Sequence, residues 1–307
     1  MTPHEGSSHR LKIGLLTRDP DAWCSTQLRR AIRQRGLEPV TFGFADVVAR
    51  VGADPKVTAW RREGGIDLIA EVPAIIVRPI GRGSLDETIF RLDILHRLER
   101  QGVKIFNPPS AIEKAVDKYY ALTILEEKGI PVPRTIVAEN AHRALDAFHE
   151  LGDDVVVKPV FGSRGIGITR VSDPEIAQRI FRSLDFLHHV LYLQEFVRHG
   201  RKDIRALVIG DRVVAAMNRV ARGWKTNVSQ GAKPVPLKPD PELERLVVRA
   251  AKAIDCEIAG VDVMEGPNGR LINEINSQPG FRGLQSVTQI DIAGQIVDHA
   301  ITRIRAR

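Results

Sequence analysis

The segment VVVKPVFGSRGIGI (155–168) combines a lysine with a glycine-rich turn. Lys158 ends an apolar, strand-like run, and glycines follow at positions 162, 165 and 167. Glycines allow successive backbone N–H groups to face one anion, and a nearby lysine supplies a positive charge for phosphate. Two interpretations stay open: a phosphate-binding loop, and a plain hairpin with a solvated lysine. The apolar strand around Lys158 favours the first, because a charge there needs a partner.

Two carboxylates and an amide are expected to converge in GVDVMEGPNGRLINEINSQPG (260–280). The triplet PNG (267–269) suits a three-residue hairpin loop. The resulting register places Asp262 opposite Glu274, with Asn276 two residues further along the same face. Such oxygen ligands select Mg²⁺ or Mn²⁺, so this hairpin predicts a metal site. The alternative is a solvated strand face.

Other polar residues are uninformative when each is taken alone. LYLQEFV (191–197) is typical of a strand, and a short polar connection leads from it to Asp203 and Arg205. That pattern also fits an ordinary core strand with an ion pair at its end. Lys118 by itself fits a solvated helix residue.

The order of the elements predicts the architecture that positions these residues. Strand-like and helix-like segments alternate over residues 11–108, which predicts a parallel sheet covered by helices. Pro108-Pro109 cannot continue a strand ladder, so a boundary is expected there. Residues 134–191 are typical of a small α+β unit, and strands follow up to a last helix at 290–304. We therefore predict an N-terminal α/β domain (1–108), a central lid domain (109–193) and a C-terminal domain with the metal site (194–307).

Composition narrows the class of ligand. The chain has 307 residues, of which 43% are hydrophobic, and a net charge of +7 that fits an anionic partner. Aromatic residues make up only 5%, and none alternate with basic residues as in a base-stacking surface, so a phosphate or carboxylate ligand is favoured over nucleic acid. The two cysteines, Cys24 and Cys256, indicate neither a disulfide scaffold nor a zinc site. No signal peptide or membrane span is expected, which favours a cytoplasmic protein.

Together these segments resemble the ATP-grasp superfamily, and within it the RimK-type ligases that add glutamate to a carboxyl group. The resemblance runs from Lys12 to the last helix, and it implies an ATP-grasp fold, α/β and α+β, preceded by an N-terminal parallel-sheet domain. The metal set of the family matches Asp262, Glu274 and Asn276. Its nucleotide-binding positions match Lys118, Lys158, Gly162, Ser163, Gly165, Gly167, the hinge residues Gln194, Glu195, Phe196 and Val197, and Asp203 at the ribose hydroxyls. NSQPGFRGLQ (276–285) is similar to the family's NxxPG segment, and WKTNVSQGA (224–232) to its mobile loop with Asn227.

The resemblance also implies a reaction. Such ligases transfer the γ-phosphoryl group of ATP to a carboxylate, and an amine then attacks the acyl phosphate to give an amide. The expected cofactors are ATP and two Mg²⁺ (or Mn²⁺) ions, and the expected substrates are L-glutamate and a carboxylate acceptor, either a small molecule or a protein C-terminus. Arg219 and Asn227 are the candidate catalytic residues. The alternatives are a nucleotide-binding regulatory or RNA-associated protein without ligase activity, and a ligase for another amino acid.

The acceptor is indicated more weakly. The order Arg78-Pro79 departs from ribosomal-protein ligases, while RPIGRG (78–83), FRLDILHRLE (90–99) and RGLQSVT (282–288) look more like the glutamate ligases of tetrahydromethanopterin-type pterins. Arginine forks bind carboxylates with two hydrogen bonds. We therefore expect Arg78, Arg82, Arg205 and Arg282 to hold the acceptor, although a surface arginine is often only solvated. A homo-oligomer is also expected.

Overall fold

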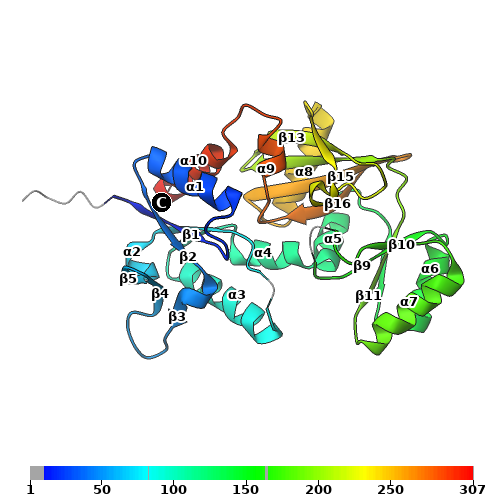
Figure 1. The fold of residues 1–307 in the computed structure, drawn as a ribbon, viewed down its shortest axis with the longest axis horizontal. Coiled ribbons are helices and arrows are strands. Elements are labelled where there is room, and N and C mark those ends of the chain that lie inside the picture. Colours follow the sequence, from blue (N-terminus) through cyan, green and yellow to red (C-terminus); the bar gives the residue numbers. More distant parts are fainter. Residues whose placement is uncertain (1–9, 82, 163–164, 307) are drawn as a thin grey trace, which may run out of the picture. The chain divides into compact units, whose positions relative to one another are not determined.

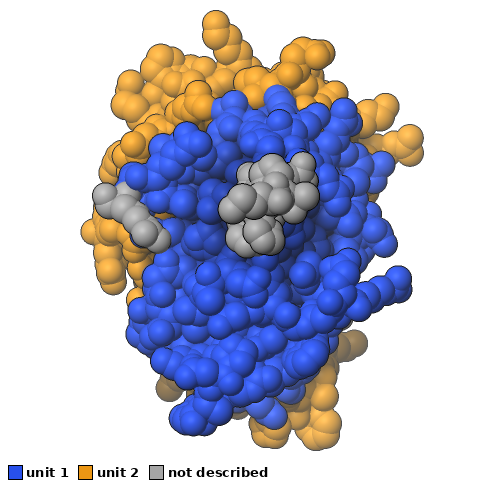
Figure 2. Space-filling model, turned by 90° about the vertical axis from the view of Figure 1, so that its left-hand side faces the viewer, with its two compact units in different colours: residues 1–112, 278–282, 291–307 blue, residues 113–277, 283–290 orange. Residues whose placement is uncertain are grey.

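The computed structural model describes residues 10–81, 83–162 and 165–306, which form two compact units. Unit 1 contains residues 1–112, 278–282 and 291–307, and unit 2 contains residues 113–277 and 283–290; Figure 2 colours the two units differently. Arg82 and Ser163, both predicted site residues, lie outside the described residues. The division into three domains at 108 and 193 stays a prediction.

Unit 1 is built on a parallel sheet with the strand order β2-β1-β6-β7, as the alternating pattern predicts. Its strands are β1 (Lys12–Leu16), β2 (Glu38–Phe42), β6 (Ala74–Val77) and β7 (Lys104–Phe106). Helices α1 (Trp23–Gln34) and α10 (Ile292–Arg305) lie together on one side of this sheet in Figure 1. We expected the last helix in the C-terminal domain, but α10 belongs to unit 1, where its buried apolar face packs and Asp298 pairs with Arg35, the residue that follows α1.

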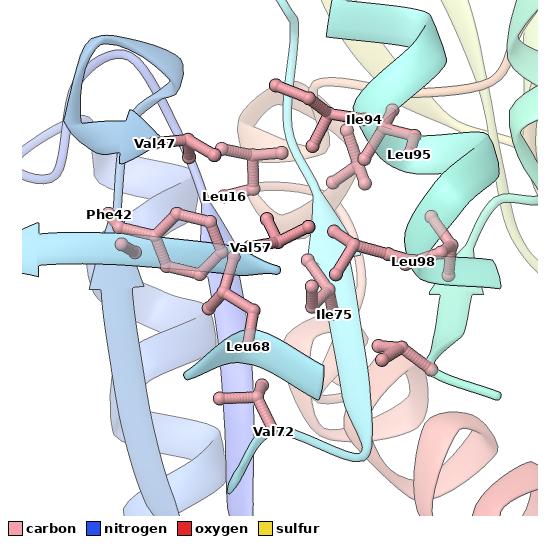
Figure 3. Close-up of a cluster of buried hydrophobic side chains, with 14 of the residues drawn as sticks. Leu16, Phe42, Val47, Val57, Leu68, Val72, Ile75, Ile94, Leu95 and Leu98 are labelled. Atoms are coloured by element: carbon pink, nitrogen blue, oxygen red, sulfur yellow. The ribbon is translucent and has the colours of Figure 1, made fainter. Parts of the chain in front are cut away.

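The other side of this sheet is covered by α3 (Leu85–Arg100) and by a small antiparallel sheet, β3-β4-β5, that the sequence did not predict. This sheet consists of β3 (Val47–Ala49), β4 (Val57–Arg61) and β5 (Gly64–Asp67), flanked by the short helices η1 (Phe44–Asp46) and α2 (Leu68–Glu71). Figure 3 shows Val47 and Val57 packed with Leu16, Ile75 and Leu95 in one buried cluster. Burial of such apolar side chains is the main stabilising term of the unit.

Unit 2 begins within α4 (Pro109–Val116) and contains two antiparallel sheets. The first has the order β10-β9-β11-β8 and packs against α6 (Ala141–Glu150) and α7 (Pro174–Phe186) through Phe148 and Phe181. Its strands are β8 (Thr135–Ala138), β9 (Val155–Lys158), β10 (Thr169–Val171) and β11 (Leu191–Glu195).

The second sheet of unit 2 has the order β14-β13-β12-β15-β16 and is covered by α8 (Pro241–Ala253). Its strands are β12 (Lys202–Ile209), β13 (Arg212–Val220), β14 (Lys233–Pro236), β15 (Ile258–Gly266) and β16 (Gly269–Asn276). Helix α5 (Lys118–Glu127), η2 (Val228–Gln230) and α9 (Arg282–Gln285) complete the list.

The β15–β16 hairpin differs from its predicted form at the loop. Gly266 pairs with Gly269, so the loop has two residues and not three. The register then shifts by one between Asp262 and Val263, and this shift restores the predicted pairing of Asp262 with Glu274. The residue inserted by the bulge is Asn273.

Candidate functional site

One cavity of unit 2 gathers most of the predicted site residues. It holds about 860 Å³ of space, part of it open to solvent. The predicted residues that line it are Lys118, Lys158, Gly162, Gly165, Gln194, Glu195, Phe196, Val197, Asp203, Arg219, Asn227, Asp262 and Glu274. Gly167, Arg205 and Asn276 belong to the same unit but not to this lining.

The two lysines lie beside the glycine-rich turn. Lys118, at the first position of α5, donates through Nζ to the carbonyl oxygens of Val160 and Gly162 (3.1 and 2.9 Å). Lys158, at the end of β9, donates to Oε1 of Gln194 (2.6 Å) and to Oδ1 of Asn273 (2.9 Å). Both ammonium groups therefore face the cavity and are held by neutral oxygens, an arrangement that leaves their positive charge available to an anion.

Burial changes the pKa of both lysines. It lowers the pKa of Lys158 from 10.5 to about 8, with Glu274 opposing the shift and Lys118 adding to it. Burial also lowers the pKa of Lys118. A bound phosphate would favour the charged form of both groups, because an opposite charge raises the pKa of an amine.

The hinge residues lie along and just after β11. Gln194 is buried, and its amide joins Lys158 to the hydroxyl of Thr135 (Nε2 to Oγ1, 3.0 Å). The N–H of Phe196 donates to the carbonyl oxygen of Asp154 (2.9 Å), so that group is already used. The ring of Phe196 contacts Trp224, at 5.9 Å between centroids, and the guanidinium of Arg170, whose Cζ lies 3.5 Å from the Phe196 centroid. Aromatic and apolar side chains thus border this end of the cavity.

The carboxylate pair fits a hard divalent cation. Asp262 and Glu274 face each other on neighbouring strands. Asp262 is 2% exposed, and its Oδ1 forms an ion pair with Nε of Arg205 at 2.5 Å. Two carboxylates that face each other, one of them buried, have the chemistry of Mg²⁺ or Mn²⁺ ligands.

Asn276 is less well placed. Its Nδ2 donates to the carbonyl oxygen of Gly260 (3.4 Å), and its role as a ligand stays a prediction. Within the described part of the chain, no cluster of three or more His, Cys, Asp and Glu side chains is placed to hold a metal ion.

Asp262 also belongs to a buried network of two aspartates and two arginines, which are Asp203, Asp262, Arg205 and Arg219. Arg219 donates to both oxygens of Asp203, through Nε (2.7 Å) and NH2 (2.5 Å), and its NH2 also lies 3.1 Å from Oδ2 of Asp262. Arg205 donates to the same Oδ2 (3.2 Å), and Thr226 donates to Oδ2 of Asp203 (2.6 Å). Both oxygens of Asp203 thus accept hydrogen bonds from the protein, and the expected contact of this residue with ribose hydroxyls stays a prediction.

Charge balance stabilises this network. Burial by itself lowers the pKa of Arg219, but Asp262 and Asp203 more than offset it, and the net shift is upward. Burial raises the pKa of Asp262, and the adjacent Arg205 and Arg219 counteract that shift. The guanidinium of Arg219 is therefore a fixed positive charge at the cavity wall.

The predicted acceptor arginines of unit 1 differ in their surroundings. Arg78, 8% exposed, donates to the carbonyl oxygen of Pro279 (3.0 Å) and stacks 5.9 Å from the centroid of Phe281. These contacts give Arg78 a role in holding the NxxPG segment. Arg282, the first residue of α9, is exposed.

Sequence reasoning missed several residues of the cavity. Asn273 binds Lys158, and Thr226 binds Asp203, as described above. Lys225 donates to the carbonyl oxygen of Ile168 (2.7 Å), and His199 and Trp224 also line the cavity. One signal was present in the sequence for Asn273: the apolar residues Ile272 and Ile275 are three residues apart, and a regular strand does not place such residues on one face.

Comparison with known proteins identifies the family of the chain. A family model described as the RimK-like ATP-grasp domain matches residues 115–300. The tetrahydromethanopterin:alpha-L-glutamate ligase of Methanococcus maripaludis is 32% identical over 296 residues, which cover 95% of this chain and 98% of that protein. A probable alpha-L-glutamate ligase of Legionella pneumophila is 32% identical over 294 residues, covering 94% and 95%.

Solved structures show the same fold. The ATP-grasp ligase PsnB, complexed with minimal precursor, Mg and ADP, has a TM-score of 0.73 at 22% identity and covers 95% of this chain and 98% of its own. A RimK domain ATP-grasp protein from Sphaerobacter thermophilus has a TM-score of 0.73 at 22% identity, covering 94% and 98%. The expected ATP-grasp fold is thereby confirmed, and no helix of the described residues is long and apolar enough to cross a membrane. By its family match and its relatives, the chain belongs to the RimK-like ATP-grasp family and is a ligase.

Proposed function

We propose that this protein joins L-glutamate to a carboxylate of an acceptor in an ATP-dependent reaction that passes through an acyl phosphate. The observation that carries the proposal is a cavity of unit 2 that brings together Lys118 and Lys158, the carboxylates of Asp262 and Glu274, and the guanidinium of Arg219. Cations for phosphate, ligands for a divalent metal and a fixed arginine are what phosphoryl transfer to a carboxylate requires.

Each group has a defined task. Lys118 and Lys158 hold phosphate oxygens of ATP, and the glycine-rich turn beside Lys118 excludes water from the acyl phosphate. Asp262 and Glu274, with Asn276, would hold Mg²⁺, which when bound neutralises charge on the transferring phosphoryl group. Arg219 stabilises charge on the same group. An acceptor carboxylate oxygen attacks the γ-phosphorus and ADP leaves; the glutamate amine then attacks the acyl carbon, phosphate leaves, and the amine loses a proton to solvent.

The acceptor is proposed to be a small pterin-type molecule that ends in a carboxylate. Support comes from the tetrahydromethanopterin ligase, which matches over nearly the whole chain. Arg205, next to Asp262, is proposed to bind a carboxylate of the acceptor, and exposed Arg282 is proposed separately as an acceptor-binding residue of unit 1. A protein C-terminus is the second candidate acceptor. Two Mg²⁺ ions, a cytoplasmic location and a homo-oligomer complete the proposal.

The test is an ADP-release screen of the twenty amino acids, each paired with pterin acceptors and with peptides that end in glutamate, followed by mass spectrometry of the product. The expected result is ADP formation that needs glutamate and acceptor together, with a mass gain of one glutamyl residue. ADP release with another amino acid and none with glutamate would contradict the proposed substrate but not the family.

A further inference from the structure

The segment 224–230 contacts two different parts of unit 2 through alternate residues. Nζ of Lys225 donates to the carbonyl oxygen of Ile168 (2.7 Å), at the end of the glycine-rich turn. Asn227 lies against Gly165 of the same turn so closely that a Cβ on Gly165 would stand 2.5 Å from Oδ1 of Asn227. The residue between them, Thr226, is 7% exposed and donates in another direction, to Oδ2 of Asp203 (2.6 Å).

Oδ2 of Asp203, which accepts a hydrogen bond from Thr226, also accepts one from Arg219. Asp203 Oδ2 accepts from NH2 of Arg219 and Oδ1 accepts from its Nε, so the plane of this carboxylate sets the plane of the guanidinium. Asp203, Arg219 and Thr226 are each less than a tenth exposed, so loss of one donor leaves a largely buried carboxylate oxygen with one hydrogen bond fewer. The hydroxyl of Thr226 therefore helps to fix the orientation of Arg219.

We infer that Thr226 is a positioning residue that couples the seating of the glycine-rich turn to the orientation of Arg219. When the turn holds Lys225 and Asn227, Thr226 is placed on Asp203, and Asp203 then holds Arg219 towards the cavity. This inference rests on the proposed function in taking Arg219 as the group that stabilises the transferred phosphoryl. It assigns to Asp203 a role inside the protein, as the acceptor that joins Thr226 to Arg219.

The first experiment needs no substrate. Hydrogen–deuterium exchange of the full chain is compared for wild type, Thr226→Val, Thr226→Ser and the control Thr123→Val, whose hydroxyl donates only to the carbonyl oxygen of Tyr120 within a helix. Valine keeps the shape of threonine and removes its donor. We expect at least about threefold faster exchange in T226V both at 224–231 and at 202–205 and 217–220, which carry Asp203 and Arg219, with near wild-type exchange in T226S and T123V.

The second experiment uses the acceptor and amino acid that the ligase screen identifies. Loss of a hydrogen bond to a buried charge predicts a kcat about tenfold or more lower in T226V, a KM for ATP within about twofold of wild type, and recovery in T226S. In an Arg219→Lys background, T226V should add little, because its effect passes through Arg219. A merely space-filling Thr226 would leave kcat unchanged in the isosteric valine variant.

Two results overturn the inference: unchanged exchange at 217–220 in T226V, or effects of T226V and R219K on kcat that multiply independently. Should T226V not fold, Lys225→Met, which loosens the other side of the same segment, must speed exchange at 217–220 as well. Absence of ligation by the wild type would refute the proposed function, while the exchange experiment would still decide the coupling.

Discussion

Lys158 should lower the stability of the protein without nucleotide, and by an amount that depends on pH. Its pKa falls from 10.5 when unfolded to about 8 when folded, because of burial. The unfolded chain therefore binds more protons between these values, and stability rises with pH across this window. Below pH 8 the charged lysine lowers the free energy of unfolding by its full amount, about 3 kcal/mol at 1.36 kcal/mol per pKa unit. This value is an upper bound, because the side chain is partly exposed. Near pH 9.5 about 1.4 kcal/mol of it remains.

The measurement compares wild type with Lys158→Met by urea unfolding at about pH 7 and about pH 9.5, with EDTA and without nucleotide. Methionine also leaves the oxygens of Gln194 and Asn273 without their donor, but that loss does not depend on pH and cancels in the comparison. We expect wild type to gain about 2 kcal/mol relative to the variant between the two pH values. Lys252→Met, at an exposed lysine of α8, serves as the control for general effects of charge removal.

The same variant should lose nucleotide affinity, because Lys158 faces the cavity. Calorimetry with ADP and Mg²⁺ is expected to show binding at least about tenfold weaker, the scale of one lost charged hydrogen bond. A stability difference that does not change with pH would refute the buried-charge argument. Unchanged affinity of the variant for both ATP and ADP would support the alternative interpretation, in which the glycine-rich turn is a plain hairpin.

Three further outcomes are expected. Glu274→Gln keeps the shape of the side chain and removes one of two facing negative charges. Mg²⁺-dependent turnover should therefore fall more than about tenfold, while the melting temperature without nucleotide stays the same or rises slightly. Normal turnover in this variant would show that Glu274 is not a metal ligand. Arg282→Ala should raise the KM for the acceptor several-fold with little change in the KM for ATP, and an unchanged KM and turnover would place acceptor recognition elsewhere. Arg78→Ala should instead destabilise the protein in thermal unfolding by about 1–3 kcal/mol, since it leaves the carbonyl of Pro279 unpaired, and a variant as stable as wild type would contradict that contact.

Local patterns made part of the structure predictable. The apolar runs of β1 and β6, the glycine-rich turn and the facing acids of the hairpin each depend on residues close in sequence, and the structure has them. The β3-β4-β5 sheet was missed because its strands are short and include the glycines of β5, which weaken a strand pattern. The bond from Thr226 to Asp203 spans 23 residues and follows from the pairing of whole strands, which no spacing in the sequence reveals.

The β15–β16 hairpin shows how two departures from the predicted register cancelled. A two-residue loop alone would have placed Asp262 opposite Asn273, leaving Glu274 one position out of register and on the other face of the sheet. The bulge restores Glu274 to that position, and it leaves Asn273 outside the regular ladder, where its amide oxygen receives Lys158. A regular hairpin with a three-residue loop would have given the same carboxylate pair but no partner for the lysine from this strand. The bulge therefore does two things at once: it aligns the metal carboxylates and it holds the phosphate-facing lysine beside them.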